Sequence, residues 1–87
     1  MKEVMMMDHK VDSWRIGKIL RDIRLWTKCS QAEIGKRLGK TQSYVSQLEL
    51  GKIQMSIYDI EKICSSFDGL EVENFTQNKP INWTNVC

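Results

Sequence analysis

The chain has 87 residues, of which 41% are hydrophobic and one is proline. This length supports a single domain with a modest core, and the composition excludes an intrinsically disordered chain. No apolar run approaches the roughly 18 residues of a membrane span, and the start does not resemble a secretory signal. We therefore expect a cytoplasmic protein that does not bind a membrane.

Residue types that carry catalysis or bind metals are sparse. The three cysteines form no Cys-x-x-Cys pair, and the chain has one histidine. This is not a metal-ligand pattern, and an odd number of cysteines is typical of a reducing compartment. The sequence has no glycine-rich phosphate loop and no nucleophile–base motif. We expect no catalytic residue, no metal, no cofactor and no enzymatic activity.

Charge is unevenly distributed along the chain, although the net charge is only +2. Residues 14–54 carry nine Lys or Arg against three acidic residues, whereas residues 55–87 carry two against five. A basic middle and an acidic end suggest one surface for a polyanion and a second surface for another contact. Charge alone is equally compatible with an ordinary solvated surface.

Composition and periodicity divide the chain into three parts. Residues 1–12 are expected to form a flexible N-terminal segment, and residues 13–75 a helical domain. Residues 76–87 are expected to form a C-terminal tail that is extended or docked on the domain or at a dimer interface. The tail is polar and interrupted by Pro80, and Trp83 is its only large anchor.

The first helix is expected over about residues 13–27. Asp12 or Ser13 is the candidate N-cap, because both types accept hydrogen bonds from free backbone N–H groups. The apolar positions follow helical spacing and predict the buried stripe; they are Ile16, Ile19, Leu20 and Ile23.

A second helix is expected over about residues 31–38. Ser30 and Glu33 have the spacing of a capping box, in which each side chain bonds the other's backbone N–H group. Gly35 is expected to face the next helix, where a small residue permits a close crossing. Gly39 then supplies the turn, since a left-handed backbone costs glycine little.

A third helix is expected to follow Thr41, its N-cap, and to end before Gly51. Val45 and Leu48 are three residues apart and therefore face the core. The opposite face is polar and free to enter a groove; it comprises Gln42, Ser43, Ser46 and Gln47.

Ser56 is expected to cap a fourth helix. Residues 70–75 could alternate as a strand or form one helical turn, and we favour the turn because every upstream element is helical. The expected apolar stripe of the fourth helix is Ile57, Ile60, Ile63, Cys64 and Phe67.

Two short helices joined by a glycine-containing turn form the helix-turn-helix pattern. The segments "SQAEIGKRLG" and "TQSYVSQLELGK" resemble the helix-turn-helix family of Cro proteins and phage repressors, also called the xenobiotic-response-element family. The resemblance runs from about Ile16 to Phe75. It implies an all-α, lambda-repressor-like bundle of about five helices, which binds operator DNA with its third helix in the major groove. Lys28 stands where the family commonly has glycine, which implies a left-handed Lys28 or a different turn.

The resemblance assigns base readout to the third helix, over about residues 41–50. Gln42 is the leading candidate, since a Gln amide can bond both N6 and N7 of adenine. Gln47 lies on the same side and comes second, and Ser43 specifies weakly. Tyr44 could pack its ring against the second helix or touch a thymine methyl group.

Phosphate contacts are expected around the same helix, where they position the domain. Gln31 resembles the family's phosphate-binding glutamine, at a helix N-terminus that also attracts anions. The remaining candidates for phosphate contact are Lys36, Lys40, Thr41, Ser46 and Lys52.

Arg24 and Glu49 resemble a structural ion pair of the family, which links the first helix to the end of the third. The resemblance also implies a homodimer, because one small domain grips too few phosphates and bases. The acidic and apolar C-terminal part is the tentative dimer surface, although its residues could instead complete the core of one chain; they are Leu70, Val72, Phe75 and Trp83.

The sequence thus predicts a sequence-specific transcriptional regulator that binds a palindromic or pseudopalindromic operator as a homodimer. The alternative is an antitoxin, which would bind both operator DNA and a toxin protein. In that case the Met-rich start or the tail is the expected toxin-binding part.

Overall fold

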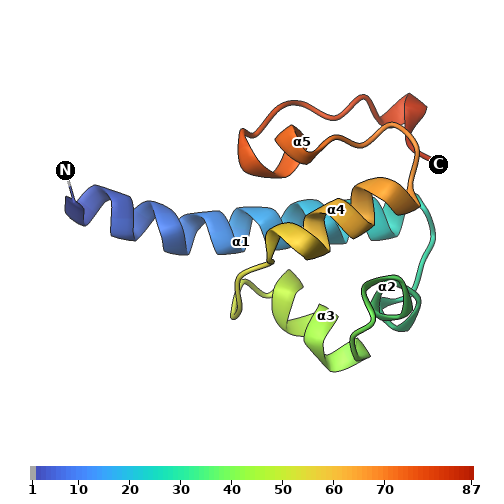
Figure 1. The fold of residues 1–87 in the computed structure, drawn as a ribbon, viewed down its shortest axis with the longest axis horizontal. Helices are drawn as coiled ribbons and strands as arrows, with labels where there is room; N and C mark the ends of the chain where they lie inside the picture. The colour runs from blue at the N-terminus through green and yellow to red at the C-terminus, as the bar shows by residue number, and fades with distance from the viewer. Residues whose placement is uncertain (1) are drawn as a thin grey trace.

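The computed structural model describes the backbone of residues 2–87 and the side chains of residues 12–87. Its regular elements are all helical in this part of the chain, which confirms the expected all-α bundle (Figure 1). In chain order the helices are α1 (Lys2–Trp26), α2 (Gln31–Leu38), α3 (Gln42–Glu49), α4 (Ile57–Ser66) and α5 (Val72–Thr76), followed by the 3-10 helix η1 (Trp83–Asn85).

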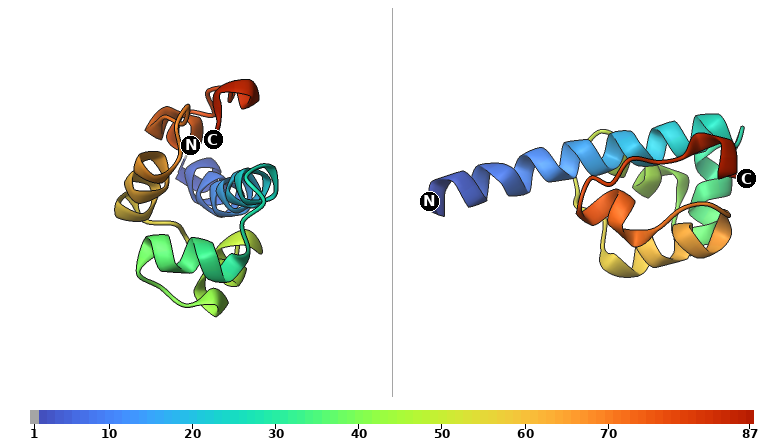
Figure 2. Two further views of the ribbon diagram at one scale, coloured as in Figure 1. Left: turned by 90° about the vertical axis from the view of Figure 1, so that its right-hand side faces the viewer. Right: turned by 90° about the horizontal axis from the view of Figure 1, so that it is seen from above.

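The first helix starts much earlier than the sequence suggested. α1 begins at Lys2, so the expected start near residue 13 was wrong. Asp12 and Ser13 resemble caps, but no Gly or Pro precedes them that would stop the helix. Asp12 instead forms an i,i+3 ion pair with Arg15 at 3.3 Å. The early part of α1 extends past the other helices (Figures 1 and 2).

The capping signals around the second and third helices are confirmed. The Ser30 side chain accepts from the N–H of Glu33, and the Glu33 carboxylate accepts from the N–H of Ser30 at 2.7 Å. Gly39 ends α2 with a φ of 68°, and Thr41 accepts from the N–H of Tyr44. Lys28 has a φ of 61°, so the left-handed alternative for this residue is confirmed.

Two glycines let the helices approach closely. A Cβ on Gly35 would lie 2.8 Å from the carbonyl oxygen of Lys40, so Gly35 accommodates the α2–α3 turn. Gly17 was not predicted to matter, yet a Cβ there would lie 2.0 Å from the carbonyl oxygen of Leu48. The backbone of α1 at Gly17 therefore lies directly against the backbone of α3 at Leu48. A larger residue at position 17 would push the two helices apart.

One core joins all five helices. Val45 and Leu48 are fully buried, as their spacing predicted. Ile57 was wrongly expected in the buried stripe; it is 47% exposed, because as the first residue of α4 it lies at the edge of the core. The core comprises Ile16, Leu20, Ile23, Ile34, Leu38, Val45, Leu48, Met55, Ile60, Ile63, Phe67, Leu70, Phe75 and Val86.

The C-terminal tail is docked on α1. The Trp26 indole N–H donates to the carbonyl oxygen of Val86 at 3.1 Å, and the Trp26 and Trp83 rings lie 5.6 Å apart. Val86 is a second anchor that the sequence analysis missed, since it is only 5% exposed. The N–H of Cys87 also donates to the carbonyl oxygen of Asp68, so the chain end is tied to the segment after α4.

Candidate nucleic-acid interface

α3 presents one polar face to solvent. Val45 and Leu48 bury the opposite face, which leaves Gln42, Ser43 and Gln47 exposed. Gln42 is the first residue of α3, and Gln47 follows after somewhat more than one turn. Three of the four side chains predicted to read bases are therefore accessible, whereas Tyr44 is half-buried.

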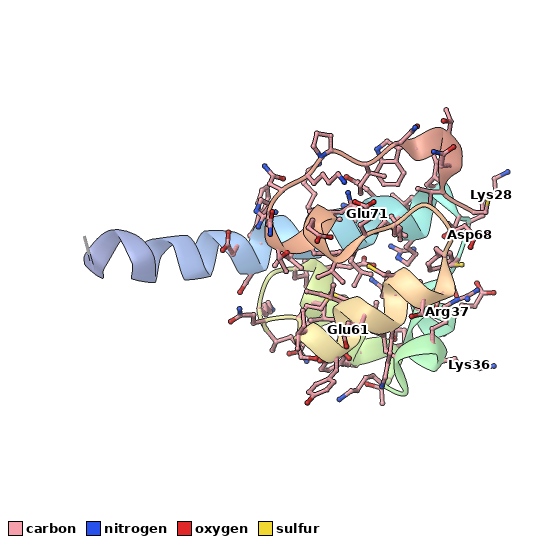
Figure 3. The ribbon with its side chains drawn as sticks, turned by 45° about the horizontal axis from the view of Figure 1, so that its top comes forward. Lys28, Lys36, Arg37, Glu61, Asp68 and Glu71 are labelled. Atoms are coloured by element: carbon pink, nitrogen blue, oxygen red, sulfur yellow. The ribbon has the colours of Figure 1, made fainter. Side chains whose placement is uncertain are left out.

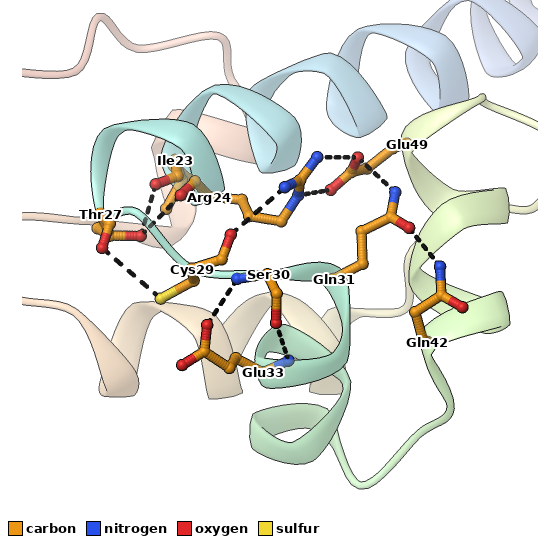
Figure 4. Close-up of polar contacts among 9 residues, drawn as sticks. All are labelled: Ile23, Arg24, Thr27, Cys29, Ser30, Gln31, Glu33, Gln42 and Glu49. Atoms are coloured by element: carbon orange, nitrogen blue, oxygen red, sulfur yellow. Dashed lines mark hydrogen bonds and ion pairs between the residues drawn. The ribbon is translucent and has the colours of Figure 1, made fainter.

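A chain of hydrogen bonds holds Gln42 in place (Figure 4). The Gln42 amide nitrogen donates to the amide oxygen of Gln31 at 2.5 Å, and the Gln31 amide nitrogen donates to the Glu49 carboxylate at 3.0 Å. Gln31 is half-buried at the first position of α2. A Gln amide has two donors and one acceptor oxygen, so Gln42 keeps one N–H and its oxygen for a ligand.

The chain of bonds ends at a fixed ion pair. The Arg24 Nε and Nη2 atoms donate to the two Glu49 oxygens at 2.7 and 3.1 Å, and Arg24 Nη1 donates to the carbonyl oxygen of Cys29 at 3.3 Å. The side chains are only 15% and 5% exposed. The hydrogen bond with Glu49 raises the pKa of Arg24. The pair thus links α1, the α1–α2 connection and α3.

Tyr44 makes two contacts that the sequence analysis did not anticipate. Its hydroxyl donates to the Asp59 carboxylate of α4 at 2.6 Å, and its ring lies 4.9 Å from the Lys40 ammonium. Burial, followed by the bond to Asp59, raises the pKa of Tyr44 to about 12. The hydroxyl hydrogen is therefore engaged within the domain.

The candidate phosphate contacts surround α3 unevenly. Lys40 and Lys52 are exposed at its two ends, and Ser46 is half-exposed on its solvent face. The Thr41 oxygen accepts the capping bond from Tyr44, which leaves its O–H free to donate.

Lys36 is exposed near the end of α2 and is shown with Arg37 in Figure 3. The Arg37 guanidinium lies over the Phe67 ring, 4.6 Å from its centre. Arg37 is thus used in packing at the end of α4, whereas Lys36 has no such contact among the described residues.

Two residues of this region were missed in the sequence. Asp59 is 2% exposed and positions Tyr44, but no local motif links two residues 15 positions apart. Arg21 lines a hollow of about 290 Å³ beside Gln31 and Ser46. The sequence could have predicted the position of Arg21. It lies three residues before Arg24, and this spacing places both residues on one face of a helix.

The residues of the tentative dimer surface differ in their exposure. Leu70 is 8% exposed and Phe75 is fully buried, so both belong to the core of one chain. Val72 and Trp83 keep part of their surface exposed. Leu70 and Phe75 therefore complete the core of one chain, which is the alternative stated for this surface.

No helix in the described part of the chain is long and apolar enough to cross a membrane. Within the same residues, no group of three or more His, Cys, Asp or Glu is arranged to hold a metal ion.

Comparison with known proteins agrees with this geometry. A helix-turn-helix family model, HTH_3, matches residues 20–73, which is more than half of the chain. Neither a curated protein nor a solved structure gives a significant match. The matched segment spans the end of α1, the whole of α2, α3 and α4, and the start of α5. The chain therefore belongs to the helix-turn-helix family of Cro/C1 type, a family of DNA-binding transcription regulators.

Proposed function

We propose that this protein is a sequence-specific transcriptional regulator that places α3 in the major groove of an operator. The Gln42 amide carries the proposal: it is exposed, fixed by Gln31, and keeps one donor and one acceptor free. That pair of groups matches the N7 acceptor and N6 donor of adenine. A side chain held in place before binding also loses less conformational freedom on contact.

The surrounding groups support contacts to the DNA backbone. Gln31 and Thr41 lie at the N-termini of α2 and α3, where free backbone N–H groups favour a phosphate. Lys40 and Lys52 place positive charge at the two ends of α3. Such contacts fix the register of the domain on DNA, so that Gln42, Ser43 and Gln47 meet base edges.

We also propose that the regulator acts in the cytoplasm as a homodimer. One α3 reads only a few base pairs, and two-fold symmetry would place two such helices about 34 Å apart on one face of DNA. With Leu70 and Phe75 buried, Val72 and Trp83 are the parts of the original surface that could still contact a second chain.

Selection from a random duplex pool, followed by salt titration of the enriched sequence, tests the function. We expect a palindrome with half-sites about 10 bp apart and a steep loss of affinity with salt. Gln42→Ala should relax the preference at one base pair per half-site, whereas Lys36→Ala should leave the selected sequence unchanged. Absence of any enriched sequence with the wild-type protein would overturn the proposal.

An antitoxin is the second candidate, because the backbone of α1 extends past the other helices (Figure 1). It would use the same DNA face and add a protein partner. Purification of the natively expressed protein would separate the two functions: a small basic protein in a fixed ratio would favour the antitoxin.

A further inference from the structure

A hollow lies between α1, α2 and α3, and the role inferred for it below rests on the proposed DNA-binding function. The hollow has a volume of about 290 Å³ and opens beside the polar face of α3. Residues from all three helices line it: Arg21, Arg24, Gln31, Ser46, Glu49 and Leu50.

The charge of this hollow is not balanced. Arg24 and Glu49 neutralise each other through two hydrogen bonds, and Gln31 bonds the same carboxylate. Glu49 is therefore occupied and does not oppose an incoming anion with a free charge. Arg21 is exposed and supplies the remaining positive charge.

Arg21 also differs from the other cations of α1 between residues 12 and 26. Each of the others has an acidic partner within 4 Å, whereas Arg21 has no ion pair or hydrogen bond to any described residue. The three pairs are Arg15–Asp12, Lys18–Asp22 and Arg24–Glu49. Arg21 is thus the cation of this stretch that has no partner among the described residues, and it lines the hollow together with Ser46 and Leu50.

The hollow also has an apolar wall. Leu50 follows α3 directly and is 58% exposed, which places a large apolar side chain next to Arg21. A nucleotide unit of the DNA backbone presents a charged phosphate beside a largely apolar deoxyribose. A guanidinium next to an aliphatic side chain is complementary to that combination.

We infer that this hollow binds a phosphate of the DNA backbone, with Arg21 as the phosphate contact and Leu50 against the adjoining sugar. This phosphate contact lies on the side of α3 that faces α1, whereas Lys40 and Lys52 are the candidate phosphate contacts at the two ends of α3. Arg21 is thereby a positioning residue: it holds α3 in register and does not select bases.

The test compares Arg21→Gln with Lys18→Gln, which removes the same charge one turn away. Each protein is titrated at several salt concentrations with the wild-type protein's selected duplex and with an unrelated duplex. For each bound protomer, Arg21→Gln should lower affinity about eightfold at 0.1 M salt and reduce the salt slope by about 0.9. Both duplexes should be affected equally. Arg21→Lys should retain much of the affinity, and Lys18→Gln should resemble the wild type.

The outcomes separate this inference from the function on which it rests. If the wild-type protein selects a sequence but Arg21→Gln binds like Lys18→Gln, the phosphate site is overturned and the regulator stands. A changed sequence preference in Arg21→Gln would also overturn it, because Arg21 would then read bases. If the wild-type protein binds no duplex, the proposed function and the phosphate site both fail. Thermal unfolding of each variant confirms that the comparison is made on folded protein.

Discussion

Single side chains in this domain link the exposed polar face of α3 to the core. Glu49 illustrates this, since its carboxylate joins Arg24 of α1 to Gln31 of α2, and Gln31 in turn holds Gln42. Because Arg24 and Glu49 are mostly buried, loss of one partner would cost up to about 3–5 kcal/mol, far more than for an exposed pair. The position of the Gln42 amide, which we propose reads a base, therefore depends on a structural ion pair.

Tyr44 and Asp59 form a second such link, between α3 and α4. Tyr44→Phe removes the only hydrogen-bond partner that the described residues give to the Asp59 side chain. Because that carboxylate is buried, we expect the free energy of unfolding to fall by about 1–3 kcal/mol. Urea unfolding followed by tryptophan fluorescence measures the change. Tyr58→Phe is the matched control, since Tyr58 is 71% exposed, and it should change stability by less than about 0.5 kcal/mol.

The same pair predicts a dependence of stability on alkaline pH. The pKa of Tyr44 is raised from 10.0 to about 12, so the folded state holds this proton more tightly than the unfolded state does. Its contribution is complete below the unfolded pKa and is lost as pH rises from about 10 to about 12. Tyr44→Phe should lack this loss. Equal alkaline slopes for wild type and Tyr44→Phe would show that the hydroxyl is not in this environment.

At the scale of elements, local signals were sufficient for α2 and α3. Ser30, Glu33, Gly39 and Thr41 act within three or four residues of themselves, so their spacing alone predicts the helix ends that the structure shows. The predicted start of α1 was wrong because Asp12 and Ser13 resemble an N-cap, although no residue before them breaks the helix. A cap-like residue permits a helix start but does not require one.

Gly17 determines how α1 and α3 pack. In an exposed helix, replacing Gly by Ala stabilises by roughly 0.5–1 kcal/mol. Here the new Cβ would lie 2.0 Å from the carbonyl oxygen of Leu48, so α1 and α3 must separate. We expect Gly17→Ala to lower the free energy of unfolding by about 2 kcal/mol, within the range for overpacked sites, and to weaken DNA binding.

Urea unfolding and duplex titration of Gly17→Ala measure both effects. Lys18→Ala on the exposed side of α1 is the control, and it should stay within about 0.5 kcal/mol of the wild type. Increased stability of Gly17→Ala, as expected for an exposed helix, would show that α1 and α3 do not meet at this residue.

At the scale of the whole molecule, contacts between residues far apart in the chain could not be predicted from the sequence. The resemblance located Gln31 and Gln42, but not the hydrogen bond between them across 11 positions. The tail shows the limit more clearly, because Trp26 bonds Val86 across 60 positions and neither residue belongs to a local motif. Trp83 was predicted as an anchor since it is large, whereas Val86 has no feature that sets it apart before folding.

The tail and α3 lie on opposite sides of α1 (Figures 1 and 2). Stability and DNA binding should therefore respond separately to changes in the tail. Val86 is 5% exposed, so Val86→Ala removes buried methyl groups and leaves a cavity, which should cost about 2 kcal/mol. Affinity for DNA should not change, because the substitution alters neither the polar face of α3 nor the Arg24–Glu49 pair.

The measurement pairs thermal unfolding with duplex titration at a temperature where the variant remains folded. Thr84→Ala is the control, since Thr84 is exposed and bonds only the neighbouring Asn82 among the described residues. A lower melting temperature with unchanged affinity would establish the tail as a support for α1. Reduced affinity in fully folded Val86→Ala would instead mean that the tail and α3 are coupled through α1, because the substitution lies on the side of α1 that faces away from DNA in the proposed complex.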